Sequence, residues 1–451
     1  MLPAHQFRNM RPEALYEKGN FLKSKFLKNT GWIMFCRIYQ AIINLVVTML
    51  TARYLGPGNF GLINYAASLC ALMTVFCTLG TNDIMVNELV TRRDCCGRIL
   101  GTTVFFRLCS TVLSIAVICL YVAAANPDEP LTLTVTALYS LSLLFQCFET
   151  IKYWYQANLM SRVPSVITCS AYTVVAIYKV ILLVTGKSVV WFAVSTTLDY
   201  GVIAILLLVC YTKQYAKEQP LCVRPRQEYS LLRRSAPFIA SGMMVALYGQ
   251  MDKIMLKQFL GETEVGYYSA AATISMMWAF VLAAVIDSAK PMILGEYQTC
   301  KSDYEKHLSQ LYGAVIYISV AAALIISLLS KPIIWVLYGE SFLPARSALC
   351  IVSWYTGFSY LGVARSIYLV SQGKQKYEKW IAASGAVCNL ILNSLMIPAW
   401  GINGAAAATL ITQVFTNLIV GFLFNDIRRN NILILKGLNL SWLLGSITGR
   451  K

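Results

Sequence analysis

Residues 55–68 read LGPGNFGLINYAAS, and residues 260–273 read LGETEVGYYSAAAT. The two stretches align without a gap at an offset of 205 residues, so that a Leu-Gly pair, a second glycine and an Ala-Ala pair coincide. The first glycine of each copy permits the backbone dihedrals of a tight reversal. The sequence therefore predicts an internal repeat in which each copy is a turn followed by a helix with a small-residue face.

The repeat lies in a chain that is dominated by apolar segments. Of its 451 residues, 57% are hydrophobic and 13% are charged, whereas soluble domains have about 45–50% and about 25%. Apolar stretches of about 20 residues can cross about 30 Å of hydrocarbon. We expect twelve such helices, near 31–54, 60–80, 99–124, 131–151, 163–185, 188–211, 236–259, 267–289, 309–330, 343–370, 380–398 and 403–424. This predicts an all-α polytopic membrane protein and excludes an ordinary soluble enzyme.

The repeat also predicts the domain organisation. Its offset joins the first helix pair to the seventh and eighth helices in the same direction through the membrane. We therefore expect two six-helix bundles around a central cavity, with a substrate site near the midplane. The expected segments are an N-terminal tail (1–30), a first bundle (31–211), a basic linker (212–235), a second bundle (236–424) and a C-terminal tail (425–451).

The net charge of +17 has an uneven distribution along the chain. Of 38 lysines and arginines, 28 fall in the tails and the loops on the side of both termini, and two fall in the opposite loops. Lys and Arg beside membrane helices stay on the cytoplasmic side, so we expect both termini to be cytoplasmic. The basic loops suit anionic membrane lipid and do not indicate a nucleic-acid partner.

Neither metal nor cofactor chemistry is indicated by the sequence. Ten of the fourteen cysteines fall in predicted helices and four in cytoplasmic loops, as expected for reduced thiols. No Cys-x-x-Cys occurs, and His5 and His307 are far apart, which argues against a metal site. Residues 186–188 read GKS, but Ile181 stands where a phosphate-binding loop needs its first glycine. We expect a transporter driven by a gradient, with no nucleotide or other cofactor.

Several predicted helices carry polar stripes. On the first, Arg37, Gln40 and Asn44 are spaced so that they share one face, which continues to Thr48 and Thr51. In the repeat, Asn64 aligns with Ser269. A polar face in hydrocarbon is costly, for a central arginine by at least ~2.5–3.5 kcal/mol, so such faces line a protein interior or a wet cavity. The alternative for a single polar side chain is a hydrogen bond between helices.

Intramembrane cations indicate the chemistry of the substrate. Arg37 and Arg107 lie roughly 10–12 Å inside the inner ends of their helices, which favours a place in the cavity. Lys179, Lys253 and Arg365 lie about two turns from a helix end, where snorkelling to the headgroups is an alternative. A cavity with surplus cations suits an anionic substrate, because arginine binds phosphate with a fixed fork geometry. Polar side chains around it suit a hydroxyl-rich sugar.

Three intramembrane acids are candidates for coupling transport to a proton or Na⁺: Glu149, Asp199 and Asp252. The alternative for each is that the carboxylate neutralises a nearby arginine or lysine.

Three stretches resemble a known family. Residues 52–61 (ARYLGPGNFG) resemble the end of helix 1 in the Wzx-type O-antigen flippases, which are bacterial polysaccharide biosynthesis proteins. Residues 252–256 (DKIML) with 260–271 resemble that family's helix 7–8 motif, and residues 400–409 (WGINGAAAAT) resemble the motif that opens helix 12. One departure is Lys257-Gln258, where relatives often have Gly-Tyr before Phe-Leu-Gly.

The resemblance implies the multidrug/oligosaccharidyl-lipid/polysaccharide exporter fold, with two six-helix bundles forming a V-shaped cavity. It implies a flippase that moves undecaprenyl-diphosphate-linked oligosaccharide across the bacterial inner membrane by alternating access, and it places a polysaccharide polymerase among the expected partners. Lys253 is the cation that falls in an aligned motif. The alternative is a drug or cation antiporter of the same superfamily, which would favour acids over bases in its lumen. A membrane-embedded glycosyltransferase or polymerase would need a longer loop than any expected here.

Overall fold

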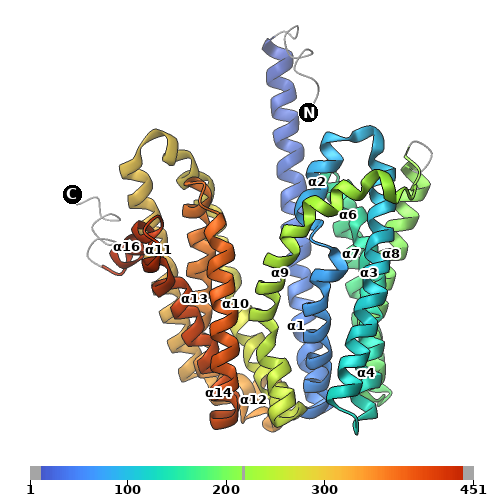
Figure 1. Ribbon diagram of the computed structural model, residues 1–451, viewed down its shortest axis with the longest axis vertical. Helices are drawn as coiled ribbons and strands as arrows, with labels where there is room; N and C mark the ends of the chain where they lie inside the picture. Colours follow the sequence, from blue (N-terminus) through green and yellow to red (C-terminus); the bar gives the residue numbers. More distant parts are fainter. Residues whose placement is uncertain (1–11, 216–218, 440–451) are drawn as a thin grey trace. The chain divides into compact units, whose positions relative to one another are not determined.

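The computed structural model describes residues 12–215 and 219–439. Within residues 12–37 only the side chains of Trp32 and Cys36 are described, and that of Asp83 also lies outside the described part. Every regular element of these residues is a helix (Figure 1). In chain order they are α1 (Pro12–Thr78), α2 (Asn82–Thr91), η2 (Arg93–Cys95), α3 (Cys96–Ala125), α4 (Pro130–Ser140), α5 (Ser142–Gln146), η3 (Cys147–Glu149), α6 (Thr150–Ala157), α7 (Arg162–Val184), α8 (Val189–Tyr215), α9 (Pro225–Leu260), α10 (Glu262–Thr299), α11 (Lys301–Leu328), α12 (Ser330–Tyr338), η4 (Glu340–Phe342), α13 (Ala345–Ser371), α14 (Lys376–Val414), the π-helix η5 (Phe415–Ile419), α15 (Val420–Leu423) and α16 (Arg428–Gly437).

The described helices provide twelve membrane crossings, as predicted. Nine segments are long and apolar enough to span a bilayer. Two of them, Ile38–Thr78 with 41 residues and Lys376–Leu423 with 48, are about twice the length that one crossing needs. Non-helical backbone at Gly56 (φ 72°) and Gly401 (φ 61°) divides each into two crossings. The twelfth is α9, which has 36 residues but is less apolar than the others. The all-α membrane fold is therefore confirmed.

The first helix begins earlier than the sequence suggested. We expected its membrane part from residue 31, whereas α1 begins at Pro12. Proline suits the first position of a helix, because its fixed φ is helical and no hydrogen-bond partner is lost there. No proline occurs between Pro12 and Pro57, so no proline interrupts the helix before the break at Gly56. The side chain of Arg37 lies outside the described part of this helix.

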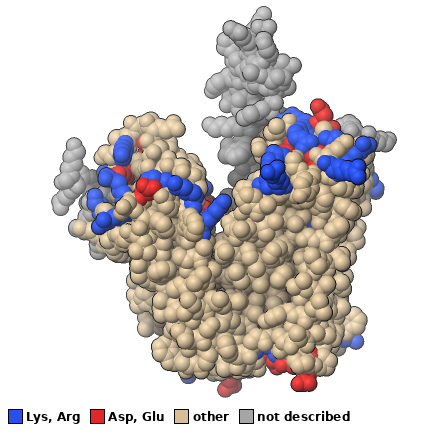
Figure 2. Space-filling model, in the orientation of Figure 1, with Lys and Arg blue, Asp and Glu red and all other residues tan. Residues whose placement is uncertain are grey.

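The chain packs as two compact units that do not follow the chain order. Unit 1 contains the residues up to Thr48, Phe76–Val117 and Ala137–Phe238, and unit 2 contains Met49–Val75, Ile118–Thr136 and the residues from Ile239 onward. Unit 2 therefore includes segments from both expected six-helix halves. On each unit, lysines and arginines gather at one end and the middle of the surface is almost free of charge (Figure 2). We call this the basic end.

Each unit has its own apolar core. In unit 1, Met85 and Leu89 of α2 pack with Ile99 of α3 and Tyr211 of α8. The Trp154 ring meets Tyr155, Tyr211 and Tyr215 at centroid distances of 4.4–5.3 Å. In unit 2, α10, α11, α13 and α16 share a core that includes Leu282, Tyr312, Leu361 and Ile434.

The segment expected as a basic linker is docked on unit 1. A Cβ on Gly97 would lie 2.2 Å from the carbonyl oxygen of Pro220, and one on Gly101 would lie 2.7 Å from that of Cys222. These two glycines are four residues apart on α3, so they form one groove along the helix for the extended chain. The backbone N–H of Arg224 donates to Thr102 Oγ1 at 2.9 Å.

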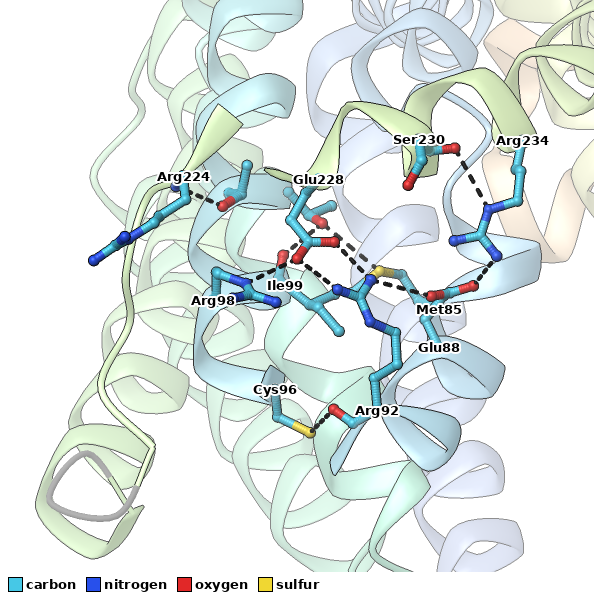
Figure 3. Close-up of polar contacts among 12 residues, drawn as sticks. Met85, Glu88, Arg92, Cys96, Arg98, Ile99, Arg224, Glu228, Ser230 and Arg234 are labelled. Carbon is cyan, nitrogen blue, oxygen red and sulfur yellow. Dashed lines mark hydrogen bonds and ion pairs between the residues drawn. The ribbon is translucent and has the colours of Figure 1, made fainter. Parts of the chain in front are cut away.

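Ion pairs hold the start of α9 beside the docked segment (Figure 3). Glu228 is fully buried and accepts two hydrogen bonds from Arg92 (2.7 and 2.8 Å) and one from Arg98 Nε (2.9 Å). Arg234 Nη1 lies 2.6 Å from Glu88 Oε1. The hydrogen bonds to Glu228 raise the pKa of Arg92, so its guanidinium stays protonated. The first turns of α9 therefore belong to unit 1.

The two copies of the sequence repeat meet within unit 2. The turn glycines Gly56 and Gly261 both have left-handed backbones, with φ of 72° and 95°. A Cβ on Gly61 would lie 1.8 Å from the carbonyl oxygen of Glu262, and a Cβ on Gly266 would lie 2.0 Å from that of Pro57. Gly61 aligns with Gly266, and Pro57 aligns with Glu262, so the contact is reciprocal. The repeat is therefore a structural repeat whose copies touch.

Candidate functional site

Arg107 is the most completely buried cation that the sequence singled out. Its side chain on α3 is 2% exposed. The guanidinium donates to Thr81 Oγ1 through Nε (3.0 Å) and to Asn82 Oδ1 through Nη2 (2.7 Å). Both partners stand at the start of α2, just after Leu79 and Gly80, which have positive φ. Arg107 therefore fixes the turn between α1 and α2, and among the described residues no carboxylate forms an ion pair with it.

Four more charged groups of unit 1 interact with Arg107 or with one another. Glu149 of η3 forms an ion pair with Lys152 of α6. Asp199 of α8 interacts electrostatically with Lys179 of α7, with Lys152 and with Glu149, and its Oδ1 is buried without a hydrogen-bond partner. Glu149 also interacts electrostatically with Arg107. The structure thus brings together four of the predicted charges, Arg107 included, and adds Lys152.

We call these five residues the unit 1 charge cluster: Arg107, Glu149, Lys152, Lys179 and Asp199. It contains three cations and two carboxylates, so it keeps a surplus of one positive charge. The cluster spans α3, η3, α6, α7 and α8 at the depth of the membrane-spanning segments. Tyr172 and Tyr200 interact electrostatically with its acids. Such a mixture of cations, hydroxyls and aromatic rings can bind an anionic, hydroxylated ligand.

Asp252 forms a second buried centre, in unit 2. Its carboxylate on α9 is 5% exposed and accepts hydrogen bonds from Tyr268 Oη (2.6 Å), Asn393 Nδ2 (2.7 Å) and Thr409 Oγ1 (2.6 Å). Asn393 Nδ2 also donates to Asn389 Oδ1 at 2.9 Å. The partners lie on α10 and on both arms of α14. We call Asp252, Tyr268, Asn389, Asn393 and Thr409 the Asp252 cluster.

The Asp252 cluster has no cation of its own. Among the described residues no lysine or arginine forms an ion pair with Asp252. The adjacent Lys253 is not in direct contact with the carboxylate and interacts with it only through longer-range electrostatics. Asn393 Oδ1 is buried without a hydrogen-bond partner. A buried carboxylate needs a partner of opposite charge or strong hydrogen bonds. Here it has neutral donors, together with amide and hydroxyl oxygens that could turn toward a cation.

The remaining predicted residues do not join these clusters. Arg365 is buried in α13, and its Nη1 donates to the carbonyl oxygen of Thr416 in the π-helix at 2.8 Å. Lys253 is half-buried, and Ser269 is buried with an unpartnered Oγ. The other polar side chains have contacts on their own helix or a neighbouring one: Gln40 with Cys169, Asn44 with Thr48, and Asn64 with the Phe60 carbonyl.

Sequence reasoning missed Lys152, Tyr268 and Lys257. Lys152 stands three residues after Glu149, a spacing that places both on one helical face, but it lies one residue beyond the predicted helix 131–151. Tyr268 lies inside the second repeat copy, where the alignment singled out the adjacent Ser269 instead. Lys257 is 1% exposed and pairs with Glu129 and Glu262, and the sequence signal was its departure from the family pattern.

Comparisons with known proteins agree with this architecture. The family model described as "Polysaccharide biosynthesis protein" matches residues 26–294. The capsular polysaccharide biosynthesis protein CapF of Staphylococcus aureus is 20% identical over 406 residues, which are 88% of this chain and 98% of that protein. The structure of a lipid II flippase MurJ in an inward closed conformation has a TM-score of 0.71 at 15% identity, covering 92% of this chain and 98% of that one. An inward-facing multidrug resistance MATE family transporter has a TM-score of 0.65 at 14% identity, covering 88% and 96%.

Proposed function

We propose that this chain, which belongs to the polysaccharide biosynthesis protein family, is a flippase for undecaprenyl-diphosphate-linked oligosaccharide. It moves this lipid from the inner to the outer leaflet of the bacterial inner membrane by alternating access between two six-helix halves. The basic end and both termini face the cytoplasm. The similar proteins that have been described are membrane transporters and polysaccharide biosynthesis proteins, which supports transport rather than enzymatic chemistry.

The unit 1 charge cluster is the observation that carries this proposal. Arg107, Lys152 and Lys179 outnumber Glu149 and Asp199 at membrane depth, so an approaching diphosphate meets uncompensated positive charge. Bringing a diphosphate unaided into hydrocarbon is prohibitive. Because part of the cationic charge is already balanced by the two acids, the cluster attracts the headgroup without holding it irreversibly. The headgroup can be released on the outer side of the membrane only if the acids offset part of the positive charge that binds it. Arg37, Lys253 and Arg365 remain further candidates for contact with the headgroup, and Gln40, Asn44, Asn64 and Ser269 for contact with its sugars.

The Asp252 cluster supplies the coupling to an ion gradient in this scheme. A proton or Na⁺ would replace the neutral donors as the partner of the Asp252 carboxylate. Asn393 Oδ1, which has no partner, and Thr409 Oγ1, which lies 2.6 Å from the carboxylate, would then face the ion, since Na⁺ takes oxygen ligands. Glu149 already has Lys152 as its partner, and Asp199 interacts with Lys179. Asp252 is therefore the coupling candidate that the structure favours.

Deletion of the gene in its own host tests the function. We expect loss of a surface polysaccharide together with accumulation of its lipid-linked repeat unit on the cytoplasmic side. Restoration by the intact chain, but not by a chain with Arg107→Ala, would support the proposal. If the polysaccharide remains normal and the cells become sensitive to cationic drugs, the antiporter alternative holds instead. A polymerase partner predicts that the two proteins can be cross-linked in the same membrane.

A further inference from the structure

Lys257 is a lysine buried at the end of unit 2 opposite the basic end. Its side chain is 1% exposed, and its Nζ lies 2.6 Å from Glu129 Oε2 and 2.7 Å from Glu262 Oε2. Lys257 belongs to the last turn of α9 and Glu262 to the first turn of α10. Glu129 belongs to the loop between α3 and α4, which is 128 residues away in sequence. The triad therefore joins the two halves of the chain.

A second polar contact lies beside the triad. Gln258 Nε2 donates to Tyr65 Oη at 3.0 Å and to Asn126 Oδ1 at 3.3 Å. Tyr65 belongs to the first repeat copy and Asn126 to the same loop as Glu129. Thr132 Oγ1 donates to Glu129 at 2.6 Å and orients its carboxylate toward Lys257. Two adjacent residues of α9 thus hold two segments of the first half.

The helices beneath these contacts approach each other backbone to backbone at two glycines. Gly61 and Gly266 let the start of one helix approach the start of the other so closely that a methyl group on either would collide with a carbonyl oxygen. At these two positions, separation of the helices pulls no side chain out of a packed pocket. Separation instead breaks ion pairs and hydrogen bonds, whose groups water can then solvate.

The exposure of the partners agrees with a reversible contact. The carboxylate side chains of Glu129 and Glu262 are 42% and 44% exposed, whereas Lys257 is nearly fully covered. Opening would hydrate Lys257 and leave both acids in water, so no charge would be stranded in a dry interior.

We propose that Lys257, Glu129 and Glu262, with Gln258, Tyr65 and Asn126, form a polar latch that closes the outer face and must open to release the flipped lipid. The proposal rests on the proposed function, because only a transporter that alternates its access needs the outer face to open. It also explains the departure from the family pattern, since Lys257 and Gln258 are the two residues that α9 contributes to the latch.

Cross-linking tests whether the latch opens during transport. In a chain with Asn126→Cys and Gln258→Cys, a short, membrane-impermeant bis-methanethiosulfonate should form a disulfide with each thiol from outside, with loss of its two sulfinate groups, and so join the two positions reducibly. Transport of lipid-linked oligosaccharide should stop and should return after reduction. The two single variants, treated in parallel, should keep transporting. Failure of the double variant to cross-link would overturn the closed contact, and undiminished transport by cross-linked protein would overturn the latch.

A charge exchange tests the triad without any transport measurement. Ser269→Cys places a thiol at a buried position in the same unit, and its labelling by an impermeant maleimide reports opening of the outer face. Lys257→Glu should raise the labelling rate at least fivefold, and adding Glu129→Lys should restore the low rate, because one lysine again faces two acids. Lys331→Glu, an exposed lysine, is the matched control. An unchanged rate in Lys257→Glu, or no restoration, would overturn the latch even if flipping is confirmed. If labelling responds as expected but no flipping occurs, the proposed function fails, and only the part of the proposal that says these residues close the outer face is supported.

Discussion

Gly61 and Gly266, which occupy equivalent positions of the sequence repeat, each lie against the backbone of the other's helix. The two distances are nearly equal: a Cβ would lie 1.8 Å from the Glu262 oxygen in one case and 2.0 Å from the Pro57 oxygen in the other. A reciprocal contact of this kind is what a two-fold relation between parallel repeats produces. The internal repeat is therefore used directly as a contact surface.

Replacing either glycine should force the two repeat copies apart. Gly61→Ala or Gly266→Ala places a methyl group where a carbonyl oxygen stands, and backbone cannot move aside as a flexible side chain can. We expect overpacking of about 1–3 kcal/mol, seen as a lower melting temperature of the purified protein in detergent. Gly295→Ala on α10 is the control, because nothing lies within 4 Å of its Cβ position. Equal melting temperatures for all three variants would contradict the contact.

Arg107 should be needed for surface polysaccharide beyond its role in folding. Arg107→Ala removes a charge and the hydrogen bonds to Thr81 and Asn82. Arg107→Lys keeps the charge but loses the planar guanidinium, which can bind phosphate through two parallel hydrogen bonds. We expect no polysaccharide with alanine and a reduced amount with lysine, at normal membrane levels of both proteins. Lys331→Ala should leave the polysaccharide unchanged. Normal polysaccharide in the alanine variant would remove Arg107 from the substrate pathway.

Asp252→Asn should uncouple transport from its driving ion. The amide has the size of the carboxylate and can keep hydrogen bonds with Thr409 and Tyr268, so the fold should persist. Without the negative charge, however, the site cannot hold a proton or Na⁺. We expect flipping to lose its response to an imposed proton or Na⁺ gradient, measured in vesicles. A full gradient response in this variant would show that another carboxylate, such as Glu149 or Asp199, carries the ion.

Glu228 should stabilise the docking of α9 on unit 1. Glu228→Gln keeps the shape but loses the ionic part of the bonds from Arg92 and Arg98, and hydrogen bonds to charged groups contribute about 1.5–3 kcal/mol. The arginines are about 30% exposed, at 31% and 29%, so water compensates them in part and we expect the lower end of that range. The measurement is thermal unfolding, with Glu340→Gln as a control. A larger loss in the control would refute this assignment.

The latch should withstand mild acid. Burial alone would raise the pKa of Glu129, but the hydrogen bonds from Lys257 and Thr132 outweigh it and lower this pKa below its usual 4.5. A carboxylate with a depressed pKa contributes stability above its unfolded pKa and loses it only as the pH falls through the folded value. Labelling of the Ser269→Cys chain, divided by that of a free thiol in solution to remove the loss of thiolate at lower pH, should therefore stay constant from pH 8 to pH 5. A rise in labelling near pH 6 would show that Glu129 titrates without the help of Lys257.

The fold could be predicted from the sequence because each membrane crossing is marked by its own stretch of residues. Apolar length gives the crossings, and Gly56 and Gly401 give two of the turns. The charge clusters could be predicted only in part. Glu149, Lys179 and Asp199 were visible as costly residues in apolar segments, but their grouping depends on how α6, α7 and α8 pack.

The residues that were missed share one property. Tyr268 and Lys257 acquire their roles from partners at distant positions: Asp252 for the tyrosine, and Glu129 for the lysine. Glu262 lies only five residues from Lys257, but the sequence does not show that Glu129, 128 residues away, completes the pairing that buries the lysine. Such long-range polar pairs require the packed structure.

Reconstitution of the purified chain into vesicles tests the central claim most directly. Undecaprenyl-diphosphate-linked oligosaccharide is incorporated in both leaflets, and the fraction accessible to an external sugar-modifying enzyme is followed with time. The account predicts that the wild-type chain makes the inner pool accessible, and that Arg107→Ala leaves it at the rate of protein-free vesicles. A wild-type rate equal to that of protein-free vesicles, with an imposed ion gradient present, would contradict the account.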